Sequence, residues 1–392
     1  MKLKRNPEDF IVTEINSREP TTGSFALYRL SKRSIGTLEA LQIAQRSWNV
    51  APKSVDHAGL KDRHADTQQL ITIRNGPKAR FEQELFLLEY LGQTPTPIEA
   101  ADIVGNEFEI VLRSLPIDAA TEIESRAAKV GTLGYPNYFD QQRFGSLGPS
   151  LEFVAAKWCQ KDYERATWLA LAEYNSHDDA EEREQKQLLR DNWGEWIECK
   201  QLLNRSHRRS VVTYLCDHPD KFRKAFALIN EDLRGIYLSA FQSAVWNRML
   251  GITLDDAAPD GPVAERIAIG DASLPFGSSP NVTAEMQLQL PSARCKGLDE
   301  KTRALCDAAL QPYGMTLPDM KLSFPRDRWF SRAQRNCLIR PDNLTAATSD
   351  DEDYPGRQKV SLSFSLPRGC YATMLVKSLT GDTEGDRDKN ED

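Results

Sequence analysis

Short runs of alternating apolar and polar residues dominate the first 115 positions and predict β-strands with one buried face. In the clearest run, Phe108, Ile110 and Leu112 lie two residues apart, so their side chains share a face. The predicted strands cover 9–15, 25–30, 69–74, 86–91 and 107–115, and helical spacing predicts helices over 38–48 and 121–133. Thr37 can cap the first helix. Its expected inward positions are Leu38, Leu41, Ala44 and Trp48.

Helical spacing takes over after Gly148, and strand patterns return only near the end of the chain. Residues 151–174 and 185–250 predict helices, and the Gly- and Pro-rich residues 251–300 predict irregular or β structure. Later strands are expected over 337–339, 360–366 and 371–379. This order predicts an α+β fold in which one domain interrupts another. We place the split domain at 1–149 and 336–380, the insertion at 150–335, and an acidic, disordered tail at 381–392.

The composition sets broad limits on what this chain can be. Its 392 residues, 40% of them hydrophobic, can form a sizeable core, which excludes a globally disordered protein. No stretch approaches the roughly 20 apolar residues of a membrane span, and the first residues lack the apolar core of a secretion signal. The seven cysteines are scattered and form no CxxC pair. They indicate neither a zinc ribbon nor a disulfide framework, which fits a reducing cytoplasm.

The net charge of -7 argues at first against a nucleic-acid partner, but the acidic residues are segregated. Residues 178–184, 350–353 and 382–392 each carry a net charge of -4, so the remainder of the chain carries +5. Dense runs of like charge repel one another, and we expect all three acidic blocks to be solvated loops or tails. The remaining body is mildly basic, and RNA binding is compatible with it.

Two clusters of basic residues fit an RNA partner. One covers residues 204–209 with Lys221, Arg223 and Lys224; the other comprises Arg326, Arg328, Arg332 and Arg335, interleaved with Trp329 and Phe330. Arginine beside aromatic rings suits phosphate contact combined with stacking on unpaired bases. A solvated helix face would show the same composition, and both interpretations stay open for each cluster.

Residues 57–69 hold the densest polar cluster, on a loop that leads into a predicted strand. Asp62 lies between Lys61 and Arg63, and neighbouring cations keep a carboxylate ionised, as a nucleophile or general base requires. A surface turn with local ion pairs would look the same. A further alternative is a metal site built from His57, Asp62, His64 and Asp66. Its spacing matches no established metal motif, and the two flanking cations would repel the ion.

Six segments, in order along the chain, resemble the motifs of one enzyme family. They are 6–14 (NPEDFIVTE), 58–69 (AGLKDRHADTQQ), 105–108 (GNEF), 136–145 (PNYFDQQRFG), 237–247 (YLSAFQSAVWN) and 364–373 (FSLPRGCYAT). The family they resemble is the TruD family of tRNA pseudouridine synthases. Because the segments run from residue 6 to residue 373, the resemblance spans nearly the whole chain.

The resemblance implies an enzyme that isomerises one uridine of RNA to pseudouridine without a cofactor or a metal. The implied substrate is tRNA, with position 13 as the family precedent, and we expect a cytoplasmic monomer. The implied fold is a mixed, mainly antiparallel sheet with helices, interrupted by a family-specific α/β insertion domain. In this interpretation residues 1–149 and 336–380 form the catalytic domain, and residues 150–335 form the inserted TRUD domain.

Position within these motifs also implies a role for individual residues. Asp62 matches the nucleophile. The implied substrate-binding residues are Asn106, Phe108, Phe364, Phe10, Lys4 and Lys61. A flipped base needs a flat apolar partner and a polar group at its edge, which Phe108 and Asn106 can supply. Without the motif, those two residues would be interpreted as strand core and a turn residue. Lys4 or Lys61 would keep the nucleophile ionised. The candidates for RNA contact are Arg143, Arg208 and Arg209.

Three departures from the family pattern bear on activity, and one of them is the net acidity together with the acidic run after residue 178. Asp140 stands where the family usually has Gly, so a positive φ there would be strained. The stretch before Gly105 is acidic and contains proline, where family members tend to be basic. A diverged, non-catalytic RNA-binding protein or tRNA-folding chaperone on the same fold is therefore a second hypothesis. A metal hydrolase built on His57 and His64 is a third.

Overall fold

The structure is a computed structural model, and it describes residues 1–175, 177–258, 265–277, 281–322 and 329–381. Its chain forms two compact units: Met1–Tyr135 with Ile339–Asp392, and Pro136–Leu338. The units thus divide after residues 135 and 338, where the predicted domain boundaries lay after residues 149 and 335. The assignment of a catalytic and a TRUD domain to them stays a prediction. The expected acidic tail lies outside the described residues, apart from Gly381.

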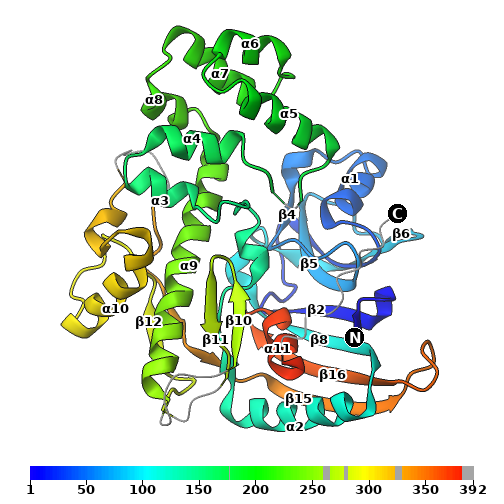
Figure 1. Cartoon of the computed structure of the whole chain (residues 1–392). Helices are drawn as coiled ribbons and strands as arrows, with labels where there is room; N and C mark the ends of the chain where they lie inside the picture. The colour runs from blue at the N-terminus through cyan, green and yellow to red at the C-terminus, as the bar shows by residue number, and fades with distance from the viewer. Residues whose placement is uncertain (176, 259–264, 278–280, 323–328, 382–392) are drawn as a thin grey trace. The chain divides into compact units, whose positions relative to one another are not determined.

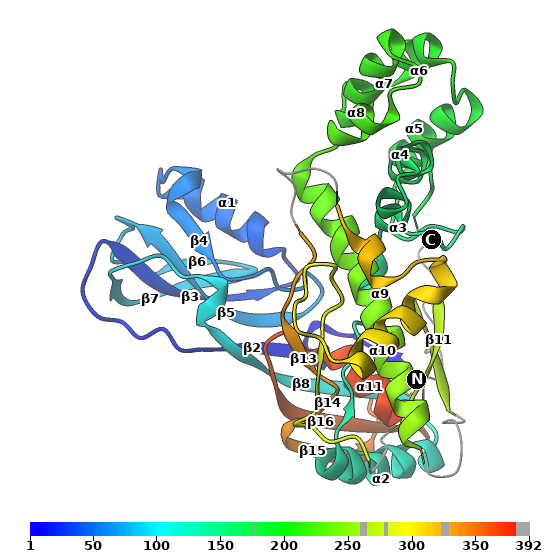
Figure 2. The same ribbon diagram turned by 90° about the vertical axis from the view of Figure 1, so that its left-hand side faces the viewer.

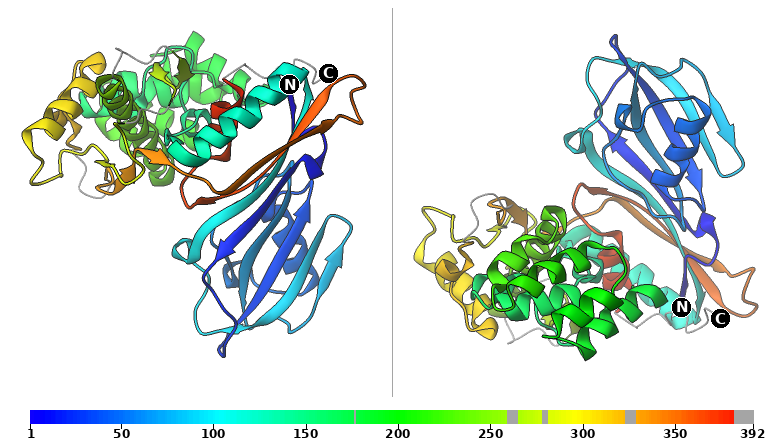
Figure 3. Two further views of the ribbon diagram at one scale, coloured as in Figure 1. Left: turned by 90° about the horizontal axis from the view of Figure 1, so that it is seen from below. Right: turned by 90° about the horizontal axis from the view of Figure 1, so that it is seen from above.

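One sheet organises the first unit (Figure 3). Its strands are β1 (Lys2–Leu3), β2 (Phe10–Asn16), β3 (Phe25–Arg33), β4 (Val55–His57), β5 (Asp66–Arg74), β6 (Phe81–Gln83), β7 (Phe86–Thr94), β8 (Ile103–Leu115), β15 (Asp342–Asp350) and β16 (Gln358–Pro367). The main path runs β15-β16-β8-β2-β5-β3-β7-β6, with β1 paired to β8 and β4 to β5. Among these strands only β2 and β5 pair in parallel. The prediction of a mixed, mainly antiparallel α+β fold is confirmed.

Strand β8 lies between β2 and β16, so it brings the first and last motifs of the chain together. Phe108 of β8 is in register with Val12 of β2 on one side and with Phe364 of β16 on the other. At Gly105 a Cβ would come within 2.4 Å of the Leu366 carbonyl oxygen. The glycine before Asn106 therefore allows β8 and β16 to approach closely at the end of the ladder.

Helix α1 (Thr37–Ser47) packs on β3, β5 and β7 and forms an apolar core with them (Figure 2). Ala40, Leu41 and Ala44 are buried against the sheet. Leu38, which was expected to point inward, is 50% exposed. The predicted helix is thus present, but its buried stripe runs through Thr37, Ala40, Leu41 and Ala44 and leaves Leu38 outside it.

The C-terminal part of the first unit differs most from the prediction. Residues 371–379 were expected to form a strand, but helix α11 (Ala372–Thr380) occupies them. Its buried residues Ala372, Leu375 and Leu379 recur at helical spacing, and the short apolar run hid this period. Strand β15 was not predicted because it is a mostly polar edge strand. Helices α2 (Ile117–Leu133) and α11 pack together here, and α2 also contacts β15 and β16 (Figure 1).

Helices dominate the second unit, as the spacing predicted. They are α3 (Val154–Cys159), α4 (Tyr163–Leu171), α5 (Ala180–Asp191), α6 (Trp196–Leu202), α7 (His207–Asp217), α8 (Phe222–Ala227), α9 (Glu231–Ala257) and α10 (Glu300–Leu310). Two short ribbons pair β10 (Arg266–Ile269) with β11 (Ala272–Pro275) and β12 (Gln287–Gln289) with β13 (Gln334–Asn336). The long α9 packs against α3 and α10 (Figure 1). Across the described part of the chain, no helix is both long and apolar enough to cross a membrane.

The prediction that the acidic blocks are solvated loops or tails was wrong for the first block, which begins a helix. It was right for most of the second block, which ends β15 and continues into a turn with Asp350, Glu352 and Asp353 exposed. The first block opens helix α5, and its Asp178 pairs with the buried Lys186 at 2.8 Å. In the second block, the buried Asp351 carboxylate binds Arg113 at 3.1 Å. These contacts with cations, Lys186 of α5 itself and Arg113 of the distant β8, offset the repulsion within each block. The third block lies outside the described residues.

Candidate active site

Asp62 lies on the loop 58–65, which connects β4 to β5. The backbone of this loop is held by Lys32 of β3, whose Nζ donates to the Asp62 carbonyl oxygen at 2.6 Å. Lys32 is only 1% exposed. Burial lowers the pKa of its ammonium to about 8, although the negative charges of Asp62 and Asp66 act in the opposite direction. A buried cation therefore fixes the position of the candidate nucleophile through its backbone.

Thr37 was expected to cap α1, but Gly36 occupies the N-cap position. The Thr37 hydroxyl donates instead to Gln69 Oε1 at 2.9 Å and accepts the backbone N–H of Lys61 at 3.2 Å. The amide of Gln69 in turn donates to the Gly59 carbonyl oxygen at 2.9 Å. The residue predicted as a cap thus joins α1 and β5 to the loop that carries the candidate nucleophile.

The carboxylate of Asp62 is accessible and paired with a cation. Its side chain is 58% exposed, and Oδ2 accepts from Lys4 Nζ at 2.7 Å. Lys4 has a left-handed backbone conformation with φ of +56°, which is uncommon for a residue other than glycine. Its ammonium also lies 4.1 Å from the ring centroid of Phe10. The structure thus brings Lys4 to Asp62 and Phe10 to Lys4, and the role of both residues in substrate binding stays a prediction.

Glu14 belongs to this site and was not among the predicted residues. Its side chain is fully buried, with Oε2 3.2 Å from Lys61 Nζ. The same ammonium donates to Asn106 Oδ1 at 2.5 Å, and Asn106 is in register with Glu14 across β2 and β8. The signal in the sequence is an acidic residue at an inward position of β2, two residues after the buried Val12. Such a buried acid needs a counterion, and here it orients Lys61.

Three aromatic side chains lie beside these polar groups. Phe108 and Phe364 stack with their ring centroids 5.2 Å apart and an interplanar angle of 20°. Phe10 meets Phe108 edge to face at 6.4 Å. All three rings are buried, with Phe108 the most exposed at 8%. The predicted pocket aromatics thus form one continuous apolar cluster, which reaches Asp62 through the contact between Phe10 and Lys4.

Two other charged residues of this segment pair with neighbouring elements. Arg63 pairs with Glu39 of α1 at 2.6 Å, and Asp66, the first residue of β5, pairs with Arg33 of β3 at 2.8 Å. Ion pairs are thus present as the surface-turn interpretation expected, but their partners come from outside the turn. Within the described ranges, no group of three or more His, Cys, Asp or Glu side chains is arranged to hold a metal ion.

The candidate RNA-contact residues lie in the second unit, and their surroundings differ. Arg208 is buried; its guanidinium binds both carboxylate oxygens of Glu182 and donates to the Leu171 carbonyl oxygen at 3.0 Å. These contacts occupy the guanidinium inside the fold, so the structure does not support phosphate contact by Arg208. Arg209 is half-buried, and Arg143 is exposed and donates to Ser239 Oγ at 3.2 Å.

The substitution at residue 140 causes no backbone strain. Asp140 has a φ of -77°, so the position does not require glycine.

In the second basic cluster, Arg335 donates to the backbone oxygen of Asn137 and to its side chain, and stacks on Phe139 at 4.1 Å. Arg335 is therefore a structural contact of the PNYFDQQRFG segment. Arg326 and Arg328 lie outside the described residues.

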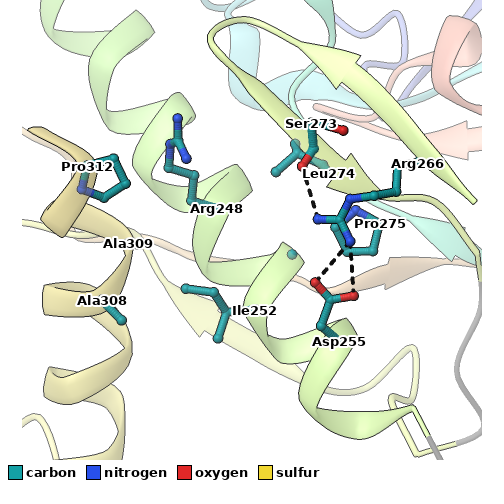
Figure 4. Close-up of a pocket in the computed structure, with 11 residues that line it drawn as sticks. Arg248, Ile252, Asp255, Arg266, Ser273, Leu274, Pro275, Ala308, Ala309 and Pro312 are labelled. Atoms are coloured by element: carbon teal, nitrogen blue, oxygen red, sulfur yellow. Dashed lines mark hydrogen bonds and ion pairs between the residues drawn. The ribbon is translucent and has the colours of Figure 1, made fainter. Parts of the chain in front are cut away.

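The second unit also contains an open pocket of about 170 Å³ between α9, α10 and the β10–β11 ribbon (Figure 4). Two arginines line it. Arg266 pairs with Asp255 at 3.2 Å, and Arg248 pairs with Asp271 at 2.8 Å. Because these cations already have carboxylate partners, the pocket offers no unbalanced charge that would select an anionic ligand.

Comparison with known proteins decides the family. The family model described as tRNA pseudouridine synthase D (TruD) matches residues 1–379. The chain belongs to this family. The resemblance found in the six motifs is thereby confirmed, and a TruD protein is a tRNA pseudouridine synthase, which is an isomerase. The family match does not favour the non-catalytic alternative.

Individual TruD relatives cover the chain almost completely. The Methanococcus maripaludis protein named "Probable tRNA pseudouridine synthase D 1" is 29% identical over 96% of this chain and 98% of its own length. The tRNA pseudouridine synthase D of Aquifex aeolicus is 26% identical over 97% of this chain and 98% of its own. A crystal structure of a TruD protein from Methanosarcina mazei has the same fold, with a TM-score of 0.71 and 24% identity over 96% of this chain and 93% of that one.

Proposed function

We propose that this TruD protein isomerises one uridine of tRNA with Asp62 as the nucleophile. The observation that carries the proposal is the placement of the Asp62 carboxylate. It is 58% exposed, 2.7 Å from the ammonium of Lys4, and attached to a backbone that Lys32 holds at 2.6 Å. An accessible, oriented carboxylate beside a fixed cation is what attack on a ribose carbon requires.

The reaction moves ribose C1′ from N1 to C5 of the same uracil. The Asp62 carboxylate either attacks C1′ or assists elimination to a glycal, and both routes break the C1′–N1 bond before the new bond forms. The uracil then rotates within the site, and C5 bonds to C1′. C5 loses its proton and N1 gains one, so substrate and product have the same atoms and no cofactor or metal takes part.

Two lysines support the carboxylate and the base in this proposal. Lys4 offsets the negative charge of Asp62 and orients its carboxylate through a hydrogen bond of 2.7 Å. Lys61, oriented by the buried Glu14, fixes the side chain of Asn106 at 2.5 Å. With its oxygen bound to Lys61, the Asn106 amide can present its NH₂ group to a uracil carbonyl. The target uracil would then be read at its edge, as flipped bases are in other nucleic-acid enzymes.

The aromatic cluster supplies the apolar side of the base site. Phe108 and Phe364 stack on each other, and Phe10 contacts Phe108 at its edge. We assign Phe108 to contact with the flipped uracil, with Phe364 and Phe10 holding its ring in place. Base–aromatic stacking is worth about 1–3 kcal/mol per base, enough to offset much of the unstacking of one nucleotide.

The remaining parts of the proposal concern the substrate and the cell. Position 13 of tRNA is the expected target, and the protein would act as a cytoplasmic monomer. Arg143 and Arg209 of the second unit would contact RNA phosphates. Phosphate contacts position an RNA without reading its sequence, so loss of either arginine would weaken binding of all tRNAs alike.

Asp62→Asn tests the proposal directly. The variant keeps the size of the side chain but removes the nucleophile, so pseudouridine formation in a tRNA transcript should be abolished while RNA affinity changes only a few fold. Asp118→Asn, at an exposed position of α2, is the matched control and should retain full activity. Modification by Asp62→Asn at the wild-type rate would refute the nucleophile assignment. Pseudouridine mapping of total RNA with and without the gene identifies the target position.

A further inference from the structure

A buried arginine in the first unit connects the second acidic block to the N-terminal motif. Arg113 of β8 is 6% exposed, and its Nε donates to both carboxylate oxygens of Asp9, at 2.9 and 3.0 Å. Its Nη1 binds Asp351 and Glu352, both at 3.1 Å. Asp353 lies 3.3 Å from the same nitrogen. One guanidinium thus gathers carboxylates from two segments more than 340 residues apart.

Residues 351–353 of the second acidic block form a turn after β15, here called the acidic turn, and this turn is itself fixed to the sheet. The buried Asp351 carboxylate accepts the backbone N–H of Ser114 at 2.7 Å in addition to the Arg113 bond. Its neighbour Asp353 accepts from the side chain of Asn6 at 3.1 Å. The turn therefore contacts the N-terminal motif directly, at Asn6, and indirectly, through Arg113 and Asp9.

The chain is attached to the rest of the unit on both sides of Lys4, by strand pairing before it and by the Arg113 network after it. Before it, Leu3 pairs with Leu112 of β8 in the short strand β1. After it, the backbone N–H of Asn6 donates to the Asp9 carboxylate at 2.9 Å, and Asp9 is bound to Arg113. The segment between the two attachments is too short to relax freely, and Lys4 takes its left-handed conformation within it. That conformation directs the ammonium to Asp62 at 2.7 Å.

Stability alone is a weak reason for this arrangement. Burying several charges carries a large desolvation penalty, and well-packed apolar residues of the same size often stabilise a protein equally well. A charge network is superior in one respect, because it fixes the direction of each group through hydrogen bonds. Here the hydrogen bonds of the network fix the conformation of the peptide segment that carries Lys4.

We propose that Arg113 and the acidic turn 351–353 act as positioning residues for the isomerisation, by holding the segment that aims Lys4 at Asp62. The proposal rests on the proposed role of Asp62. None of the positioning residues touches the substrate. Their effect reaches the reaction through Lys4, so it should appear in kcat and vanish when Lys4 cannot act.

The test combines Asp351→Asn with Lys4→Met in a double-mutant cycle, with kcat and KM measured on a tRNA transcript. Asp351→Asn should lower kcat by about ten- to a hundred-fold, the range expected for misplacement of a catalytic group, with KM within about two-fold. In the Lys4→Met background the same substitution should lower kcat by less than about two-fold, because both substitutions act through the same contact between Lys4 and Asp62. Asp350→Asn, at the exposed last residue of β15 and without a contact to Arg113 in the network described above, is the control and should keep full activity.

A second variant guards against loss of folding. Asp353→Asn changes a side chain that is 41% exposed and should fold, with a smaller loss of kcat that Lys4→Met also abolishes. Equal losses in both backgrounds, or unchanged kcat in Asp351→Asn and Asp353→Asn, would overturn the inference. So would wild-type kcat in Lys4→Met alone. If Asp62→Asn is inactive in the same assay, these outcomes refute only the positioning role; if it is active, the nucleophile assignment itself fails.

Discussion

Lys32 offers a substitution that should separate activity from stability. In Lys32→Met a chain of similar length replaces the buried ammonium, which donates to the Asp62 carbonyl oxygen at 2.6 Å. Loss of this bond frees the backbone of the candidate nucleophile. Misplacement of a reacting group by about 1 Å can lower a rate about 100-fold, so we expect kcat to fall by about that factor.

The effect on stability follows from the pKa of Lys32. Burial lowers this pKa from 10.5 to about 8 in the folded protein, so the unfolded chain binds the proton more tightly. Below pH 8 the fold must bury a charged ammonium, which costs about 3 kcal/mol. That penalty is relieved as the pH rises from about 8 to 10.5, so Lys32 makes the free energy of unfolding increase over this window. Methionine carries no such penalty at any pH.

Two effects therefore oppose each other in Lys32→Met at pH 7. The variant escapes a penalty of about 3 kcal/mol but leaves the Asp62 carbonyl oxygen without this donor, which costs about 1–3 kcal/mol. We expect its free energy of unfolding to lie within about 2 kcal/mol of the wild-type value. Between pH 7 and pH 10, wild-type stability should rise by about 2–3 kcal/mol relative to that of the variant.

Urea denaturation at both pH values and single-turnover pseudouridine formation at pH 7 measure these quantities. Lys53→Met, at an exposed position of the same unit, is the control and should change neither. A kcat within about three-fold of wild type would show that the Lys32 bond does not place Asp62. Parallel pH profiles of stability for wild type and variant would show that the ammonium is not buried as a charge.

Five further substitutions test other parts of the structure. Glu14→Gln removes the buried counterion of a lysine 3.2 Å away, and urea denaturation should show a loss of about 3 kcal/mol. Phe364→Ala removes a side chain that is 1% exposed and should lower the free energy of unfolding by about 3–5 kcal/mol. Arg209→Ala should weaken tRNA binding and reduce its salt dependence, whereas Arg208→Ala should lower the thermal midpoint and leave that salt dependence unchanged. Asp140→Gly should lower stability by about 1 kcal/mol, because φ is -77° there; a gain in stability would contradict this.

The sequence by itself determined the elements with a clear period and the family. Alternation predicted β8 and the shared face of Phe108, Ile110 and Leu112, and ordered motifs singled out Asp62 as the candidate nucleophile. The alternation depends only on neighbouring residues of one strand, and the motifs are short stretches of sequence. Both can therefore be read from a single chain without its tertiary structure. Where the period was weak, as in the polar edge strand β15 or the short helix α11, the prediction missed the strand or assigned the wrong element.

Only the tertiary structure decided which charges meet. Arg208 looked like an RNA-binding residue, but it is buried against Glu182, and Asp351 looked solvated, but it binds Arg113. Periodicity shows which side of an element a residue occupies and carries no information about the side chain opposite it. A charge is costly to bury alone and acceptable beside its counterion, so its role depends on a partner that can lie hundreds of residues away.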